Sequence, residues 1–166
     1  MHVSKKSDGE ILLSTKTGTI TIQPGVSVTV KNEQEEVIDW PGEYEISGCS
    51  VRAFSSSEGT ISFRVGLEGV RLFSPTKSVL ITEEERSEIG DIDVLFVFAE
   101  SSEWTKKDWK TFLEEVDPRM VIFGEKGEKT TALQKEIGEE SVESVEKTEI
   151  AKGKFSGEKT IFLSLV

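Results

Sequence analysis

Two runs of consecutive apolar residues, Val94–Phe98 and Met120–Phe123, constrain the fold of this chain most strongly. Strands that are apolar on both faces belong to sheets that are covered on both sides, as in layered α/β proteins. A helix is predicted before the first run, between Thr82 and Gly90, because Thr82 and Glu85 have the spacing of a capping box. Helices are therefore expected to alternate with buried strands in the second half of the chain.

A second helix, between these two runs, has clear end signals. Thr105 is the predicted N-cap, with Asp108 at the third helical position. Trp104 before the cap and Trp109 one turn inside the helix have the spacing of a hydrophobic staple, so this helix is expected to pack on a sheet. It should end at Asp117-Pro118, because proline disfavours helical geometry in the residue before it.

The first half of the chain alternates apolar with polar residues at a period of two, the pattern of half-buried strands. Turn signals such as Glu68-Gly69 separate these segments, which predicts an antiparallel sheet. The predicted strands are Ile11–Ser14, Thr19–Ile22, Val26–Val30, Val37–Asp39, Cys49–Phe54, Thr60–Val65 and Val70–Phe73. Later elements are a third helix over Thr131–Ile137 and strands over Ser144–Ile150 and Thr160–Val166.

Charge and residue counts limit the chemistry of this acidic protein. The sequence has 31 Asp and Glu against 20 Lys and Arg, a formal net charge of −11. Phosphate backbones and anionic lipids favour clustered Lys and Arg, so we expect neither nucleic acid nor a membrane as partner. One His and one Cys cannot build the usual zinc site of imidazole and thiolate ligands. A hard-cation site of carboxylates stays open on counts alone.

The length of 166 residues is that of one domain, expected to span residues 1–166. No apolar stretch is long enough to cross a membrane, and the first residues lack the apolar segment of a signal peptide. A cytoplasmic location is therefore expected.

Motifs for nucleophilic or phosphate chemistry are missing from the sequence. No glycine-rich phosphate-binding pattern occurs. A Ser or Cys nucleophile needs a neighbouring base, and His2 lies at the N-terminus, where chains are often frayed. Cys49 is expected to be a small buried hydrophobe. Catalysis by paired carboxylates stays open, because no pair is singled out among the many acids.

The most distinctive segment contains Trp40, Pro41, Gly42, Glu43 and Tyr44. Pro41-Gly42 marks a tight turn with two large amphipathic aromatic residues beside it. The structural interpretation is a strand-turn-strand corner whose aromatic side chains pack under the turn. The alternative is an interaction surface.

This segment also carries a family resemblance. Ile38–Gly48 reads Ile-Asp-Trp-Pro-Gly-Glu-Tyr-Glu-Ile-Ser-Gly and resembles the Ile-Asp-Gly-Pro-Gly-Glu-Tyr-Glu-Val-x-Gly segment of a branch of small bacterial metallo-β-lactamase-fold proteins. Gly18–Pro24, Thr60–Val65, Ile89–Leu95 and Asp117–Ile122 resemble further strands of that branch. The resemblance implies an α/β (α+β) fold of the αββα type, a two-sheet sandwich flanked by helices.

The zinc ligands of that family do not carry over to this sequence. The family's His-x-His-x-Asp-His loop would follow the early strands, but residues 25–37 contain neither His nor Asp. The later bridging Asp would fall near Pro75 or Thr76, and the last metal-binding His would fall at Glu125. The resemblance therefore implies a reduced fold that lacks the metal-ligand loop, and we expect neither zinc nor another cofactor.

We therefore expect a pseudoenzyme, a non-catalytic relative that acts as a binding or interaction module. Its vestigial cleft is predicted at Ser74, Pro75, Thr76, Glu100, Glu103 and Glu125. Two alternatives stay open. One is a hydrolase with altered, carboxylate-based chemistry in that cleft, and the other is a structural subunit of a homo-oligomer paired through exposed sheet edges. The sequence identifies neither a ligand nor a partner.

Overall fold

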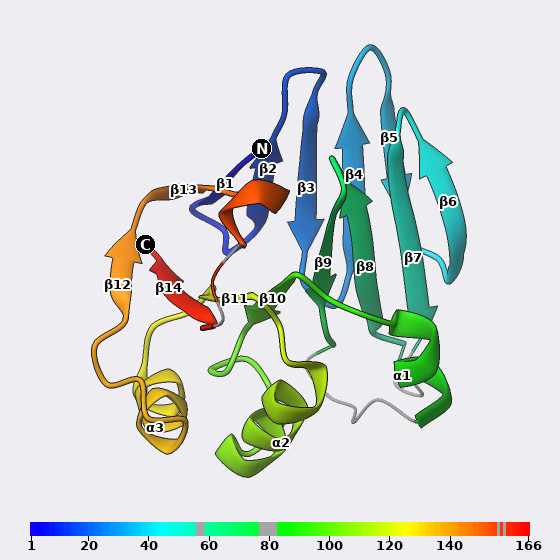
Figure 1. Ribbon diagram of the computed structural model, residues 1–166. Coiled ribbons are helices and arrows are strands. Elements are labelled where there is room, and N and C mark those ends of the chain that lie inside the picture. Colours follow the sequence, from blue (N-terminus) through cyan, green and yellow to red (C-terminus); the bar gives the residue numbers. More distant parts are fainter. Residues whose placement is uncertain (56–58, 77–82, 156, 158) are drawn as a thin grey trace.

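The protein folds into two β-sheets with helices beside the larger one (Figure 1). The computed structural model describes residues 1–55, 59–76, 83–155, 157 and 159–166. The six-stranded sheet contains β1 (His2–Lys5), β2 (Ile11–Ser14), β3 (Thr19–Gln23), β4 (Ser27–Lys31), β5 (Glu35–Ile38) and β13 (Lys147–Glu149). The eight-stranded sheet contains β6 (Gly42–Ile46), β7 (Cys49–Ser55), β8 (Ile61–Leu67), β9 (Val70–Ser74), β10 (Val94–Val97), β11 (Met120–Phe123), β12 (Glu143–Val145) and β14 (Ile161–Leu165). The helices are α1 (Glu83–Ile89), α2 (Lys106–Val116), α3 (Glu128–Glu136) and the short 3₁₀ turn η1 (Lys152–Lys154).

The two halves of the larger sheet match the two patterns in the sequence. Strands β6 to β9 pair antiparallel, as the alternating pattern predicts. Strands β10, β11 and β14 then follow in parallel with β9, and β12 is parallel to β14. The hairpin predicted at Glu68-Gly69 joins β8 to β9, with positive φ angles of 51° and 76° at these residues. The parallel half therefore places the carboxyl ends of β9, β10 and β11 at one edge.

The position of strand β10 between two cores explains why its sequence is apolar throughout. Its alternate residues Val94 and Phe96 lie in the core between the two sheets. Leu95 and Val97 lie in a second core, which the large sheet shares with the helices. All four side chains are fully buried. The three described α-helices contribute their buried residues to this second core, so they cover the outer face of the large sheet.

Helix α2 begins and ends where the sequence predicts. Thr105 Oγ1 accepts a hydrogen bond from Asp108 N at 3.3 Å, and Asp108 Oδ2 accepts one from Thr105 N at 2.8 Å, which together form a capping box. Hydrogen bonds from the side chain and backbone of Thr105 lower the pKa of Asp108. The rings of Trp104 and Trp109 lie 4.5 Å apart, as the staple requires. Asp117 adopts the left-handed conformation that ends the helix.

Several local predictions need correction or lie outside the described residues. Residue Thr82, predicted to cap α1, is not described, and neither is the side chain of Glu85. The predicted strand Ser144–Ile150 is two strands, since β12 belongs to the large sheet and β13 to the small one. Helix α3 begins three residues earlier than predicted, at Glu128. The predicted fraying of His2 is wrong, because His2 lies in β1 between β2 and β13.

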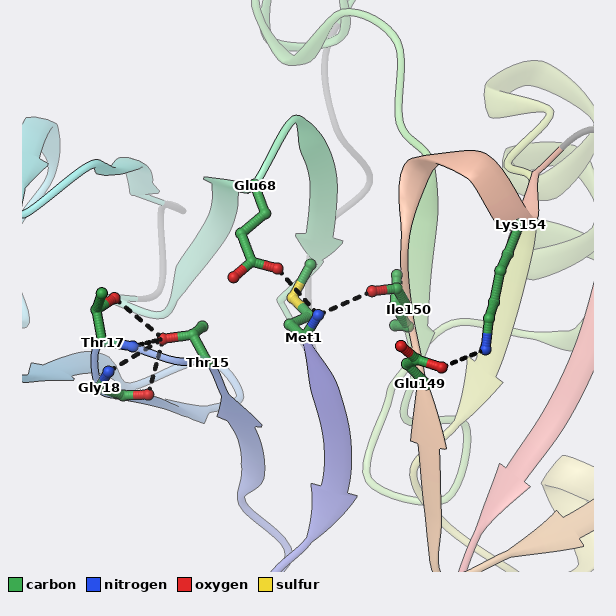
Figure 2. A network of polar contacts seen from close by, with 8 residues as sticks. All are labelled: Met1, Thr15, Thr17, Gly18, Glu68, Glu149, Ile150 and Lys154. Atoms are coloured by element: carbon green, nitrogen blue, oxygen red, sulfur yellow. Dashed lines mark hydrogen bonds and ion pairs between the residues drawn. The ribbon is translucent and has the colours of Figure 1, made fainter.

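Polar contacts tie β1 to both sheets (Figure 2). The Met1 amino group donates to the carbonyl of Ile150 at 3.0 Å and to Glu68 Oε2 at 2.9 Å. Glu68 lies in the turn between β8 and β9, whereas Ile150 follows β13. In the same view, Lys154 Nζ donates to Glu149 Oε2 at 2.6 Å. The contacts of Met1 link the start of β1, a strand of the six-stranded sheet, to the turn between β8 and β9 of the larger sheet. Local sequence does not reveal them, because the partners lie far apart in the chain.

Cys49 is buried in the core between the sheets, with 2% of its surface exposed. Burial, and secondarily the charge of Glu45, raises the pKa of the Cys49 thiol to about 12. Since the thiolate is the reactive form, we expect the native protein to resist thiol reagents at pH 8. Labelling with a disulfide reagent should be slow in the native state and complete in urea. Rapid labelling of the native protein would contradict the buried placement.

Candidate functional site

The predicted cleft lies along the edge formed by the carboxyl ends of parallel strands β9, β10 and β11. Ligands of open α/β sheets bind most often at this kind of edge. Ser74 is the last residue of β9, Glu100 and Glu103 lie between β10 and α2, and Glu125 lies between β11 and α3. The structure therefore places these residues on neighbouring loops at one end of the parallel strands.

Glu100 uses its carboxylate to cap helix α3. Its Oε1 accepts a hydrogen bond from the backbone N–H of Thr130 at 2.8 Å. The N-cap of this helix, Gly127, supplies no side-chain hydrogen bond. Glu100 packs so closely on Gly127 that a Cβ there would overlap the carboxylate. A carboxylate from the neighbouring loop thus takes the place of the missing cap, and its charge is favourable at a helix N-terminus.

Glu125 holds the same two loops together from the other side. Its Oε2 accepts a hydrogen bond from the backbone N–H of Ser101 at 3.0 Å. Lys129 Nζ adds hydrogen bonds to the carbonyl oxygens of Glu100 at 3.2 Å and Ser102 at 3.0 Å. Because one oxygen of each carboxylate accepts a backbone hydrogen bond from the neighbouring segment, the arrangement closes the loops after β10 and β11.

The residues after β9 are buried rather than open to a cleft. Ser74 and Thr76 expose 1% and 3% of their surface, and Pro75 between them is also buried. Thr76 N donates to Ser62 Oγ at 2.9 Å. The hydroxyl of Ser74 has no hydrogen-bond partner among the described residues. Residues 74–76 themselves therefore carry buried hydroxyl and backbone groups and no charged side chain.

Glu103 does not join the other two carboxylates. It is exposed and lines a separate pocket of about 290 Å³ whose other walls include Trp104, Trp109, Lys129 and Leu133. The indole Nε1 atoms of both tryptophans are buried and lack a hydrogen-bond acceptor within the described residues. Catalysis by a carboxylate pair needs two acids facing one reacting group, and this pocket contains one.

The donor set at this edge does not fit a zinc ion. A catalytic zinc site takes three protein ligands, usually with imidazole among them, and leaves one position open. His2 lies in β1 of the other sheet. Within the described ranges, no group of three His, Cys, Asp or Glu side chains is arranged to hold a metal ion. One oxygen of Glu100 and one of Glu125 already accept backbone hydrogen bonds, and two carboxylates alone do not make the three-ligand set of a catalytic zinc site.

The segment from Trp40 to Tyr44 forms the turn between the two sheets. Tyr44 Oη donates to the carbonyl oxygen of Trp40 at 2.9 Å, and its ring lies against Gly42, where a Cβ would crowd it. The Tyr and Gly of the segment thus hold the turn. Trp40 does not pack under it, since 74% of its surface is exposed. The aromatic packing predicted for the corner is therefore right for Tyr44 and wrong for Trp40.

The sequence analysis missed Lys129 and Thr130, which complete the contacts of Glu100. One available signal was the start of α3, where Gly127-Glu128 offers none of the usual Ser, Thr, Asp or Asn caps. An uncapped helix start indicates that another segment supplies the acceptor. Which segment does so depends on tertiary structure.

One comparison with known structures supports the fold. The chain is similar to the crystal structure, at 2.00 Å resolution, of a Thermotoga maritima protein assigned to the zinc-dependent hydrolases of the metallo-β-lactamase superfamily. The TM-score is 0.78 over 100% of both chains, at 19% sequence identity. No protein-family model matches the sequence, and no curated protein matches it. At this level of identity the likeness establishes a metallo-β-lactamase-like fold, which confirms the fold class expected from the sequence.

Proposed function

We propose that this chain is a non-catalytic member of the metallo-β-lactamase superfamily that acts as a binding or interaction module. The fold supports the membership. The observation that carries the functional part is the use of Glu100 and Glu125 as acceptors for the backbone N–H groups of Thr130 and Ser101.

Zinc hydrolases act through a metal-bound water whose pKa the metal lowers. In this chain the acids nearest the corresponding edge are already engaged by backbone donors. Removing Glu125 from Ser101 would leave a part-buried N–H group without its acceptor, which is costly. The backbone hydrogen bonds of Glu100 and Glu125 therefore hold these loops together without a metal ion.

The placement of Glu100, Glu103 and Glu125 also argues against carboxylate-based hydrolysis. Glu103 lines the pocket beside α2, while Glu100 and Glu125 hydrogen-bond within the loops. A general acid and a general base must both reach the reacting bond. These three acids do not face one common pocket, because Glu103 lines the pocket beside α2 and the other two accept backbone hydrogen bonds.

Metal analysis tests this proposal. Protein purified without chelator should contain no stoichiometric zinc or manganese, and the Glu125→Gln variant should give the same result. Glu128→Gln is a matched control, because Glu128 is exposed on the first turn of α3 and makes no hydrogen bond or ion pair within the described residues. Stoichiometric metal that is lost together with a hydrolase activity in Glu125→Gln, and kept in the control, would overturn the proposal.

A further inference from the structure

Three arginines lie together on the outer face of the antiparallel half of the large sheet. Arg52 on β7 and Arg64 on β8 are direct cross-strand partners. Arg71 on β9 pairs with Gly66, two residues beyond Arg64 on the same face. This concentration of positive charge is unusual in a chain with a net charge of −11. The three arginines are on β7, β8 and β9, whereas Glu100 follows β10 and Glu125 follows β11.

Two of the three arginines have acidic partners. The guanidinium of Arg52 lies 2.6 Å from Glu88 and 3.3 Å from Glu43, and it also stacks over the ring of Phe54. Arg71 lies 3.4 Å from Asp91 and 3.6 Å from Asp93. Their charges are therefore largely balanced by side chains of the protein.

Arg64 has no such partner. Within the described part of the chain its guanidinium makes no ion pair or hydrogen bond, and its Nε atom is buried without an acceptor. A guanidinium carries five N–H donors, and in Arg64 the Nε–H is the one that is buried without an acceptor. Buried donors without acceptors are rare in native proteins and call for an explanation.

The surroundings of Arg64 are electrostatically positive. Burial is the main cause that lowers the pKa of Arg64, and the positive charges of Arg71 and Arg52 lower it further. The negative charge of Asp91 acts in the opposite direction. Like charges placed directly opposite each other on neighbouring strands are destabilising. The free protein therefore carries a cost at this position, which a bound anion would remove.

A pocket of about 290 Å³ provides space for such an anion. Its lining contains Arg64 and Arg52 together with the hydroxyl-bearing Ser50. Tyr44 also lines the pocket, but its hydroxyl donates to the carbonyl oxygen of Trp40. Glu43 and Glu45 also line it, but both are exposed on edge strand β6, and Glu43 is paired with Arg52. Gly66 has no side chain and leaves room for Ser50 Oγ above it.

We propose that Arg64 is the centre of an oxoanion site that binds the phosphate group of a small phosphorylated ligand. The planar guanidinium fork matches phosphate oxygens in a bidentate geometry, and Arg52 and Ser50 supply further donors from the neighbouring strand. The site goes beyond the proposed function, since it names a ligand class and a surface that the vestigial cleft does not include. It also stands if the cleft proves to have a different role.

Thermal unfolding with inorganic phosphate tests this site, with sodium chloride added to keep the ionic strength constant. A ligand that binds only the folded state raises the midpoint in a saturable way. We expect that rise for the native sequence and for Lys107→Gln, which removes one exposed positive charge from α2. Arg64→Gln should lose the saturable rise. Glycerol phosphate then tests the class of ligand. It should bind more tightly than inorganic phosphate if the site recognises a phosphorylated molecule, and no more tightly if the site recognises free phosphate.

The order of stabilities gives a second readout. Without phosphate, Arg64→Gln should be at least as stable as the native sequence, since it removes the repulsion between Arg52 and Arg64. With saturating phosphate the native sequence should become the more stable of the two. Arg64→Lys keeps the charge but not the fork, so its phosphate affinity should fall by about tenfold. Identical phosphate responses of the native sequence and Arg64→Gln, or a loss of stability in Arg64→Gln that phosphate leaves unchanged, would overturn the proposal.

Discussion

Trp109→Ala is expected to lower the free energy of unfolding by about 3–5 kcal/mol, the usual cost of removing a buried aromatic side chain. Trp109 exposes 1% of its surface and lies in the core between the large sheet and the helices. Its ring contacts that of Trp104, which in turn packs on Phe112 at a centroid distance of 5.2 Å. Loss of this side chain therefore weakens the attachment of α2 at its first turn.

Urea unfolding followed by circular dichroism measures this effect. Trp40→Ala is the matched control, because the same atoms are removed from a residue that is 74% exposed. Its effect should stay within about 0.5 kcal/mol, as for most surface substitutions. Equal losses from the two substitutions would contradict the packing described for the helical layer.

Glu100→Ala is expected to have the second largest effect, a loss of about 1.5–3 kcal/mol, which is typical of a hydrogen bond to a charged group. The substitution removes the acceptor of Thr130 N and leaves the N-terminus of α3 without a cap. The amide hydrogen of Thr130 should also exchange faster with solvent, because its hydrogen bond is gone.

Glu114→Ala provides the comparison for this change, since Glu114 is exposed on α2 and makes no hydrogen bond or ion pair within the described residues. Urea unfolding and amide exchange should both be close to those of the native sequence in this control. An unchanged stability of Glu100→Ala would show that the carboxylate is not needed for the helix start, and would reopen a chemical role for it.

The features predicted well from sequence are those determined by neighbouring residues. Helix α2 is one of them, because its capping box, its staple and the proline after it lie within a few residues of each other. The apolar runs around Val94 and Met120 also predicted the layered fold, since only a sheet covered on both faces buries such strands completely.

The features predicted poorly depend on contacts between distant segments. Nothing local separates Ser144 from Lys147, yet the two lie in different sheets because their strands pair with β14 and β1 respectively. The candidate cleft shows the same limit. The family resemblance predicted one cleft for Glu100, Glu103 and Glu125, but only the structure assigns two of them to backbone groups and the third to a separate pocket.

A crystal structure of the protein grown in excess zinc tests whether the loops of Glu100 and Glu125 form a metal site. We expect Glu100 Oε1 to stay on Thr130 N and Glu125 Oε2 to stay on Ser101 N, with no metal bound between these loops. Zinc coordinated by Glu100 or Glu125, whether or not the backbone hydrogen bonds persist, would overturn the proposal of a non-catalytic relative.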